Sequence, residues 1–331
     1  MKTCAIVILN YNGEEMLRQF LPSVLTHSVY DVWVIDNASQ DASLEVLRRD
    51  FSPVQLIELK ENFGYAGGYN WGLAELQGKY QYYILLNSDV EVSPRWDRIL
   101  VETLDENRQA AAVQPKILSY QDSSKFDYAG AGGGYLDSFY YPYCRGRIGE
   151  VLEEDTGQYD DTVLVDWASG ACLAIRADLF HQMNGFDAHF FAHMEEIDLC
   201  VRMRQEGYQI LYNGKSAVLH LGGATLSRSS PRKLYLNIKN SLAMIYKAER
   251  GLRYYWIFLV KAIAEGAAAL GYLIKGKNEL SQAIWSGYRD FLASKDLFFP
   301  NKARSRFQKL GLSNWIYWDS LVLGKKTFKE L

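Results

Sequence analysis

Cysteine is scarce in this sequence, with four residues in 331, and no two of them form a C-x-x-C pair. They are scattered along the chain at Cys4, Cys144, Cys172 and Cys200. This usage argues against a zinc ribbon and against a disulfide framework, and a reducing, cytoplasmic setting fits it best. The first apolar stretch, residues 4–9, is too short for a signal-peptide core and is expected to be a strand.

A large excess of charge is also missing, because 36 Lys and Arg face 39 Asp and Glu, a formal net charge of −3. This balance gives no sign of a nucleic-acid partner. The net charge, however, is unevenly distributed along the chain. Residues 235–331 hold 16 basic and 7 acidic side chains, a charge of +9, whereas residues 1–234 carry −12. We therefore expect two units with different partners, divided after residue 234.

The G-x-G-x-x-G pattern of dinucleotide folds is absent from the turn after the first expected strand, which reads N-Y-N-G at residues 10–13. A hydride-transfer enzyme is therefore not favoured. A run at residues 271–277 resembles a P-loop, but Asn278 replaces the hydroxyl residue that binds Mg²⁺ and no strand precedes the run. We interpret it as a chance match.

The first half of the chain alternates short β-branched runs with helical patterns, which is typical of a mostly parallel sheet covered by helices. Strands are expected at residues 3–9, 31–36, 54–59, 81–86, 111–118, 163–167, 170–176, 209–212 and 217–220. Helices are expected at residues 14–27, 42–50, 66–76, 95–107, 177–183 and 195–206, with a nearly all-helical pattern from residue 232 onward. The Gly- and Tyr-rich residues 128–147 are expected to form a loop or hairpin over a site. The predicted fold class is α/β, a Rossmann-like open sheet with a C-terminal helical extension.

Polar side chains follow four of these strands, and ligands of open α/β sheets bind at the carboxyl ends of the strands. Asp36 is either a turn-forming residue or an acceptor for a ribose hydroxyl or a base N–H. The glycines at residues 64, 67 and 68 either relax a tight loop or let the backbone approach a diphosphate. Asp89 is either a turn former or an oxygen ligand for a hard cation.

Three acids at residues 195–198 stand near an expected helix start. They are either charges favoured by the helix dipole or a general base with its supporting neighbours, paired with Arg202 or Arg204. His220 ends the last expected strand and is either a core residue or part of a site.

Taken in order, these motifs resemble the family 2 inverting glycosyltransferases of the GT-A fold, close to their rhamnosyltransferase-like branch. The matching stretches are VILNYNG at 7–13, VIDNASQD at 34–41, ENFGYAGGYN at 61–70, LLNSDV at 85–90, WASGAC at 167–172, EEIDLC at 195–200 and VLH at 218–220. Each stretch alone is weak, but the ordered set is specific. The resemblance implies a catalytic domain at residues 1–234 and a basic, aromatic extension at 235–331.

The resemblance also implies roles for individual residues. The nucleotide-sugar donor would be bound by Asn10, Tyr11, Asn12, Asp36, Asn62, Gly67, Asn87 and Ser88. Asn87-Ser88-Asp89 matches the D-x-D metal motif of the family, with Asn at its first position, so that Asp89 would bind Mg²⁺ or Mn²⁺ and His220 would complete the metal site. The donor sugar and acceptor would be faced by Trp167, Ser169 and Gly170.

The pair Glu195-Glu196 matches an E-D pair in which the second acid is the expected catalytic base, so either Glu195 or Glu196 would take this role. The implied function is metal-dependent, inverting transfer of a hexosyl group, first of all rhamnose from dTDP-rhamnose, with UDP-hexoses as an alternative. The acceptor would be a glycan or a lipid-linked sugar in cell-surface polysaccharide synthesis. The competing interpretations are a nucleotidylyltransferase, which usually has a basic Gly-rich loop after strand one, and a catalytically dead sugar-binding module.

The extension suggests contact with the inner face of a membrane. Residues 254–274 are long enough to span a bilayer, but Lys261 and Glu265 lie near the middle, and each charge there costs about 2.5 to 3.5 kcal/mol. Spanning is therefore disfavoured, and a peripheral contact is expected, supported by Trp256, Trp285, Lys302, Arg304, Arg306, Trp315 and Trp318. The alternative is an accessory bundle packed on the catalytic domain or on a second subunit in a homodimer.

If Asp36 holds the donor nucleotide, Asp36→Ala should weaken donor binding by about 1.5 to 3 kcal/mol, the contribution of a hydrogen bond to a charged group. Calorimetric titration with UDP and dTDP measures this loss. If the affinity for UDP and dTDP does not change, Asp36 is a turn-forming residue and does not bind the donor.

Overall fold

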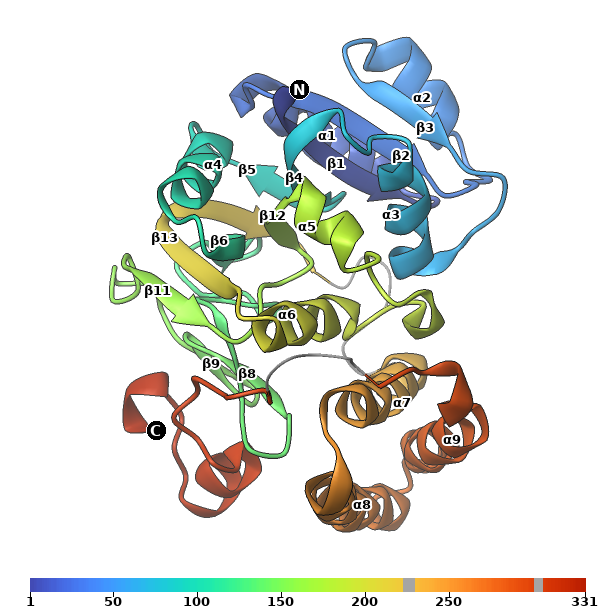
Figure 1. Cartoon of the computed structure of the whole chain (residues 1–331), viewed down its shortest axis with the longest axis vertical. Helices are drawn as coiled ribbons and strands as arrows, with labels where there is room; N and C mark the ends of the chain where they lie inside the picture. The colour runs from blue at the N-terminus through green and yellow to red at the C-terminus, as the bar shows by residue number, and fades with distance from the viewer. Residues whose placement is uncertain (223–229, 301–305) are drawn as a thin grey trace.

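The computed structural model describes residues 1–222, 230–300 and 306–331. A nine-stranded mixed sheet lies at the centre (Figure 1), in the order β11-β13-β6-β12-β4-β1-β2-β3, with β5 paired to β13. Its strands are β1 (Lys2–Asn10), β2 (Asp31–Asp36), β3 (Gln55–Glu58), β4 (Tyr80–Asn87), β5 (Val90–Val92), β6 (Ala110–Ser119), β11 (Thr162–Val165), β12 (Cys172–Arg176) and β13 (Gln209–His220). The mostly parallel α/β fold with C-terminal helices that the sequence predicted is confirmed.

Strands β3, β2, β1 and β4 are parallel neighbours, and their register aligns the expected site residues. Asn10 at the end of β1 lies opposite Asp36 of β2, and Leu9 lies opposite Asn87 of β4. Strand β12 runs antiparallel to both β4 and β6, whereas β13 runs parallel to β6. The carboxyl ends of β1, β2 and β4 therefore share one edge of the sheet.

Helices cover both faces of this sheet. One apolar core packs α1 (Glu14–His27), α2 (Ser43–Asp50) and α4 (Trp96–Glu106) against one face, and a second core packs α3 (Gly64–Ala74), α5 (Ala177–Gln182) and α6 (Glu195–Gln205) against the other. Helix α3 approaches the sheet closely because it is rich in glycine. A Cβ atom at Gly72 would lie 2.1 Å from Ile35 Cδ1, and one at Gly68 would lie 2.8 Å from Leu9 Cδ1.

The Gly- and Tyr-rich stretch contributes to a small antiparallel sheet, in agreement with the predicted hairpin. Its strands are β7 (Gly134–Leu136), β8 (Pro142–Cys144), β9 (Arg147–Ile148) and β10 (Val151–Leu152). Glycine is needed here because the indole of Trp167 lies against the backbone, where a Cβ at Gly134 would be 2.2 Å from the ring. Tyrosines fill the space between this sheet and the rest of the chain, and Tyr135, Tyr140, Tyr141 and Tyr143 are buried.

Some expected boundaries were wrong. The two strands expected at 209–212 and 217–220 are one strand, β13, with an irregular register between Asn213 and Ala217. The three-residue strand β5 was not predicted, because so short a segment has no readable period. The run after residue 232 is not nearly all helical. Most of residues 306–331 are irregular, apart from the short turns at Trp318–Val322 and Phe328–Glu330.

This irregular C-terminal segment packs on the small sheet rather than forming a separate unit. The Phe328 ring stacks on Tyr135 with centroids 5.1 Å apart, and the Ile316 N–H donates to Asp137 at 2.9 Å. The extension otherwise consists of α7 (Pro231–Ala248), α8 (Gly251–Ile274) and α9 (Asn278–Ser294) (Figure 1). The division expected after residue 234 falls inside α7. Lys302 and Arg304, expected to support membrane contact, lie outside the described residues.

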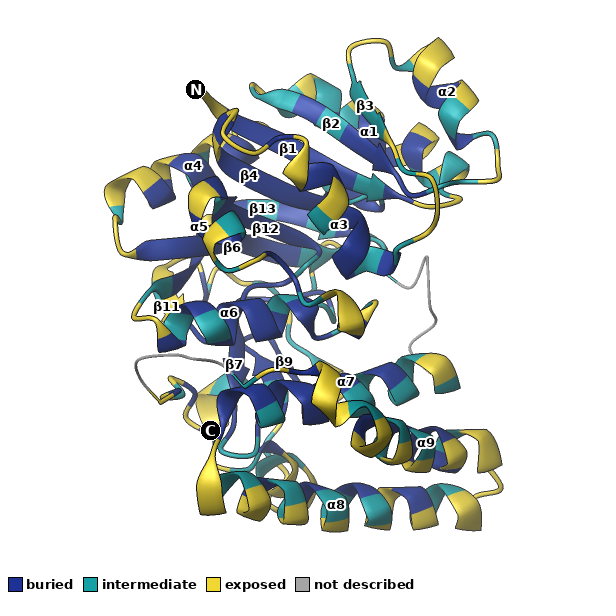
Figure 2. Ribbon diagram, turned by 45° about the vertical axis from the view of Figure 1, so that its right-hand side comes forward, coloured by how far each residue is buried: buried dark blue, intermediate teal, exposed yellow. Residues whose placement is uncertain are grey.

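Within the described ranges, α8 is the one helix long and apolar enough to cross a membrane, judged by length and composition alone. Its buried positions form a single narrow stripe of Ile257, Lys261, Glu265 and Ala269. Figure 2 shows the remaining turns of α8 largely exposed or half-buried. Lys261 pairs with Glu265 at 3.0 Å and lies 3.5 Å from the centre of the Tyr141 ring. The two charges that argued against spanning therefore face the protein.

Candidate active site

The ends of β1 and β2 form a network of buried amide and carboxylate groups. Asn10 donates through Nδ2 to Asp36 Oδ1 at 3.0 Å and to Ser39 Oγ at 3.1 Å, and Asp36 Oδ2 accepts the Ser39 N–H at 2.9 Å. The Asn12 N–H donates to Ser39 Oγ at 2.9 Å. Asn10 Oδ1 is buried without a partner among the described residues. The network fixes the side chains at this edge of the sheet.

A cavity of about 580 Å³ lies beside this network. It is lined by Asn12, Gly13, Glu14, Glu15, Met16, Asp41, Gln121, Leu221 and Gly222. Asp41 closes its wall by accepting the Glu14 N–H at the start of α1, at 3.0 Å. Tyr11, in the same turn, is 44% exposed. The cavity connects the β1 turn with the segment that follows His220.

The loop before α3 is held by amide side chains. Asn37 donates to Asn62 Oδ1 at 3.0 Å, and Asn62 Oδ1 also accepts the Gly64 N–H at 2.8 Å. The N–H groups of Tyr65 and the next residue, at the start of α3, donate to the Phe191 carbonyl, at 2.7 and 3.2 Å. Residue 67 lies inside α3, where a Cβ would be 2.8 Å from Phe63 Cβ. Helix packing thus accounts for this glycine, and two of the helix N–H groups are already used.

An acidic and imidazole cluster lies where β4 and β13 end. His220 Nε2 lies 3.3 Å from Asp89 Oδ1, and His220 Nδ1 lies 2.9 Å from Asp127 Oδ1. All three side chains are buried. Burial lowers the pKa of His220, but the hydrogen bonds with Asp127 and Asp89 outweigh it and raise the pKa to about 9. The pKa of Asp127 is lowered, because His220 and backbone N–H groups offset the effect of its burial.

This cluster suits a divalent cation held jointly with a substrate. Asp89 and His220 supply a carboxylate oxygen and an imidazole nitrogen, and both are donor atoms that divalent cations accept. Asp127 accepts from the other ring nitrogen, an arrangement that orients metal-bound histidines. The described part of the chain has no group of three or more His, Cys, Asp or Glu side chains placed to hold a metal alone. The remaining ligands would have to come from a substrate and water. Asn87 and Ser88 lie beside Asp89 at the same edge, and Asn87 donates its backbone N–H to Ala171 O at 3.0 Å.

The turn at residues 167–170 joins this cluster to α6. Trp167 is buried and donates its indole N–H to the Tyr135 carbonyl at 3.0 Å. Ser169 Oγ donates to the Ala129 carbonyl at 2.8 Å and accepts the Ala171 N–H at 3.2 Å, and the Ser169 N–H donates to Gln114. The Gly170 carbonyl accepts from the Tyr65 hydroxyl at 2.8 Å. Trp167 and Ser169 therefore shape the turn, and Gly170 is its half-exposed part.

Glu195 and Glu196 begin α6 beside this turn. Glu195 is buried, and its Oε2 has no hydrogen-bond partner within the described ranges. Burial, together with the neighbouring charge of Glu196, raises the pKa of Glu195 well above its usual value. Burial also raises the pKa of Glu196, although backbone N–H groups, including that of Gly170, and the charge of Lys233 oppose the shift. A carboxylate with a raised pKa is suited to accept a proton near neutral pH.

The segment before α6 is strained and is held by α7. Phe191, His193 and Met194 all have positive φ angles, of 61°, 68° and 72°. Such conformations persist only where the surroundings impose them. The amide nitrogen of Asn240, which is fully buried on α7, donates to the carbonyls of residues 190, 192 and 193 at 2.8 to 2.9 Å. Helix α7 therefore fixes the segment that leads into the two glutamates.

A second contact from α7 fixes the first turns of α6. Lys247 Nζ lies 2.8 Å from both Asp187 and Asp198, and Asp198 also accepts from Arg202 at 2.8 Å. The expected pairing of the acids with Arg202 is confirmed for Asp198, whereas Arg204 pairs with Asp166. Asp198 is thus a supporting residue.

Sequence reasoning missed Asp127, Asn240 and Lys247. Asp127 directly precedes the Gly- and Tyr-rich stretch, where a polar residue is ordinarily interpreted as part of a surface loop. Asn240 and Lys247 lie in an amphipathic helix, where polar residues normally indicate the solvent face. The only available signal was their position among apolar neighbours, and both are buried.

Residues 5–165 match the family model described as glycosyl transferase family 2. An N-acetylglucosaminyl-diphospho-decaprenol L-rhamnosyltransferase of Mycobacterium tuberculosis is 25% identical over 80% of this chain and 90% of its own length. Rhamnosyltransferase WbbL of Escherichia coli is 23% identical over 62% of this chain and 79% of its own.

Among solved structures, GalNAc-T7 with UDP, GalNAc and Mn²⁺ superposes with a TM-score of 0.60 at 17% identity, over 91% of this chain and 58% of that longer protein. Mannosyltransferase PcManGT from Pyrobaculum calidifontis, in complex with GDP-Man and Mn²⁺, superposes with a TM-score of 0.54 at 13% identity, over 87% and 86% of the two chains. At these identities the two likenesses show the fold.

The raised pKa of Glu195 predicts that Glu195→Gln stabilises the protein at neutral pH. A carboxyl group whose pKa is raised by folding favours the folded state below its unfolded pKa and loses that contribution as the pH rises. The variant should therefore melt higher at pH 7.5, by about 2 °C or more, with the difference shrinking toward pH 4.3, near the unfolded pKa of Glu. Calorimetry across this pH range measures the effect. Glu206→Gln, at an exposed site, is the control, and a lower melting temperature for Glu195→Gln at pH 7.5 would contradict the prediction.

Proposed function

Because this chain belongs to glycosyl transferase family 2, we propose that it performs metal-dependent, inverting transfer of a sugar from a nucleotide-sugar donor in cell-surface polysaccharide synthesis. The observation that carries the proposal is the gathering of the Asn10–Asp36 network and the Asp89–His220 pair at one edge of the sheet. Glu196 accepts the Gly170 N–H in the turn that leads into β12. Family membership argues against the nucleotidylyltransferase interpretation. The proposed donor is dTDP-rhamnose, since two relatives are named rhamnosyltransferases, and UDP-hexoses are the alternative.

In the proposed reaction the donor nucleotide lies against Asp36 and the 580 Å³ cavity, with Asn10, Tyr11, Asn12 and Asn62 around it. Buried amide and carboxylate groups suit this task, because they can accept from ribose hydroxyls and base N–H groups. The residues that would hold Mg²⁺ or Mn²⁺ are Asp89 and His220, with Asp127 orienting the imidazole. A divalent cation bound there supplies neutralisation of the charge on the leaving diphosphate.

Glu196 is the proposed base. It removes the proton of the acceptor hydroxyl while that oxygen forms a bond to the anomeric carbon, on the face opposite the diphosphate. The bond from the anomeric carbon to the diphosphate oxygen breaks, and its electron pair leaves with the nucleotide. The anomeric configuration inverts in this single displacement. Glu195, which is more deeply buried, is the alternative base.

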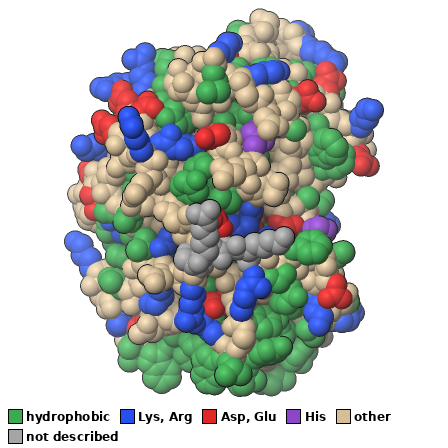
Figure 3. Space-filling view, in the orientation of Figure 1, with side chains coloured by type: hydrophobic (Ala, Val, Ile, Leu, Met, Phe, Trp, Pro, Cys, Tyr) green, Lys and Arg blue, Asp and Glu red, His purple; other side chains and the backbone are tan. Residues whose placement is uncertain are grey.

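The proposed acceptor is a lipid-linked sugar, reached from the inner face of the cell membrane. The support is the reversed polarity of α8, which buries Lys261 and Glu265 and exposes the apolar side chains Leu252, Tyr255, Trp256, Leu259, Ile263, Leu270, Leu273 and Ile274. Hydrophobic side chains cover the end of the molecule where Figure 1 places α8 (Figure 3). A soluble helix normally buries its apolar stripe, whereas an interfacial helix inserts it among lipids. The +9 charge of residues 235–331 favours an anionic surface.

Asp89→Ala and Glu196→Gln should both abolish transfer, by different routes. Asp89→Ala should weaken metal-dependent donor binding, whereas Glu196→Gln should keep donor affinity and lose roughly 10²-fold or more in rate. Donor binding by calorimetry and release of nucleotide diphosphate separate the two. Full activity of Glu196→Gln would transfer the role of base to Glu195.

The pH profile gives an independent readout of the same assignment. The base must be deprotonated, so kcat/KM should fall with decreasing pH through a value above about 4.3, the ordinary pKa of Glu. Burial raises the pKa of Glu196, and backbone N–H groups and the charge of Lys233 on α7 oppose the rise. Glu195 on the same helix and Tyr65 on α3 are the other titratable groups that interact with it. If kcat/KM instead falls through a pKa equal to the ordinary value of Glu, the base is not a buried carboxylate.

For the membrane contact, the full chain should float with anionic liposomes at low salt, and Trp256→Asp with Ile263→Asp should abolish flotation. Trp71→Asp is a matched control, because Trp71 is 58% exposed on α3 and Trp256 is 59% exposed on α8. Sedimentation without lipid tests the homodimer alternative. A wild-type dimer that the α8 variant dissociates, with no flotation of either protein, would assign this face to a second subunit instead.

A further inference from the structure

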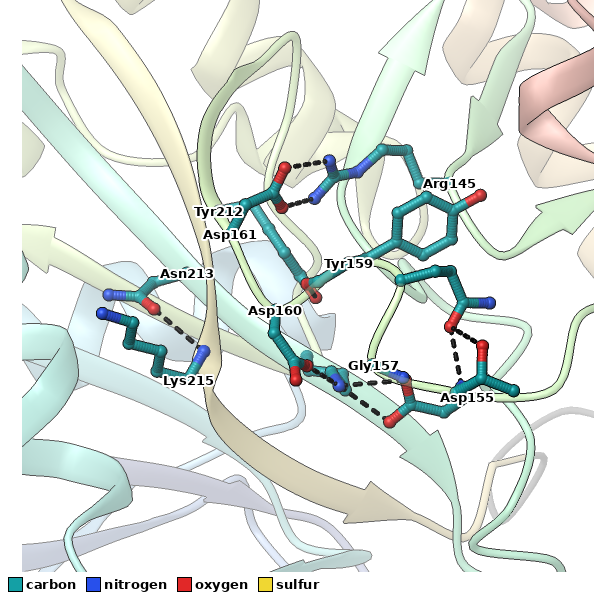
Figure 4. Close-up of polar contacts among 12 residues, drawn as sticks. Arg145, Asp155, Gly157, Tyr159, Asp160, Asp161, Tyr212, Asn213 and Lys215 are labelled. Carbon is teal, nitrogen blue, oxygen red and sulfur yellow. Dashed lines mark hydrogen bonds and ion pairs between the residues drawn. The ribbon is translucent and has the colours of Figure 1, made fainter.

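Two buried arginines two residues apart in the small sheet have very different surroundings. Arg145 forms a bidentate pair with Asp161, at 2.8 and 3.1 Å (Figure 4), and donates to the Gly132 carbonyl. Arg147, on β9, is 8% exposed and has no carboxylate partner among residues 1–222, 230–300 and 306–331. Its Nε is buried and has no hydrogen-bond partner in the described part of the chain.

The contacts of Arg147 do not neutralise its charge. Its guanidinium carbon lies 4.0 Å from the centre of the Tyr128 ring, and Nη2 lies 3.9 Å from Cys144 Sγ. Burial raises the pKa of Cys144, so this sulfur is a neutral thiol. Ring faces attract cations, but by only about 0.5 to 2 kcal/mol. A buried charge without a counter-charge is costly, and such groups normally mark the position of a ligand.

Through its contact with Tyr128, Arg147 lies near both the proposed metal site and the turn beside Glu196. Tyr128 directly follows Asp127 of the metal cluster, and the next residue, Ala129, accepts from Ser169 in the turn beside Glu196. A second cation approaches the same ring, since Lys233 Nζ lies 5.7 Å from its centre. The charge of Lys233 also reaches Glu196 and His193. Two cations from β9 and α7 therefore converge on Tyr128, close to the proposed base.

We propose that Arg147 and Lys233 bind a phosphate group of a substrate beside Tyr128. The proposal rests on the proposed function in one respect, that the substrates bear diphosphates. Either the diphosphate of a lipid-linked acceptor or that of the nucleotide donor offers this chemistry. Guanidinium groups bind phosphate oxygens with paired hydrogen bonds, and a lysine adds a point charge. A bound phosphate would supply the counter-charge that Arg147 lacks.

Calorimetric titration of the metal-free full chain with inorganic pyrophosphate tests the site directly. The wild type should bind pyrophosphate, and Arg147→Met should bind it about 10-fold or more weakly, the scale of a charge-assisted hydrogen bond. Arg147→Lys should recover part of the affinity. Lys215→Met, which removes an exposed cation shown in Figure 4, should leave binding unchanged. Melting temperatures show whether each variant is folded, and Arg147→Met should melt no lower than the wild type, because it replaces a buried unpaired charge with an apolar side chain.

Repeating the titration with saturating dTDP or UDP identifies the source of the phosphate. Undiminished pyrophosphate binding assigns the site to the acceptor, and competition assigns it to the donor. In the acceptor case Arg147→Met should raise KM for a farnesyl-diphospho-sugar and leave KM for the corresponding octyl glycoside unchanged. No pyrophosphate binding by the wild type, or equal binding by Arg147→Met, would overturn the proposal. The two pyrophosphate-binding results do not depend on turnover. They can therefore be distinguished from a failure of the proposed sugar transfer.

Discussion

The active site depends on the register in which β1 pairs with its two parallel neighbours. That register sets Asn10 opposite Asp36 and brings Asn87, and so Asp89, to the same edge of the sheet. The long strand β13 ends at this edge as well and delivers His220 to Asp89. A slip of one residue would turn every side chain to the opposite face. The donor network and the metal pair therefore have a common origin in backbone pairing.

The proposed base is positioned by a different part of the chain. Helix α6 begins after three residues with positive φ angles, and this segment is held by Asn240 and Lys247 of α7. Helix α7 of the C-terminal region thus supports the candidate active site directly. Helix α7 packs against α9, and α8 packs against both. The helix that holds the base therefore belongs to the same bundle as the apolar face proposed to contact lipid.

Some buried polar groups near the proposed base lack partners within the described residues. Among the residues that the structure describes, Glu195 and Glu196 each have a buried oxygen without a hydrogen-bond partner, and the buried Arg147 has no carboxylate partner. By contrast, the buried Arg145 pairs with Asp161 and the buried Lys116 pairs with Asp155. Unpaired charges of both signs in one region are expected where a substrate supplies the missing partners.

The sequence by itself determined the alternating α/β pattern, the polar residues at the strand ends and the acids at the start of α6. These features are local, because hydrophobic period and turn chemistry are written in consecutive residues. Only the tertiary structure decided that Asp127 orients His220, that Asn240 holds residues 190–193 and that Arg147 has no carboxylate partner within the described residues. It also decided that α8 buries its charges and exposes its apolar side chains. Each of these depends on contacts between residues far apart in the chain, and a sequence pattern shows which face of a helix is apolar but not which face the rest of the protein covers.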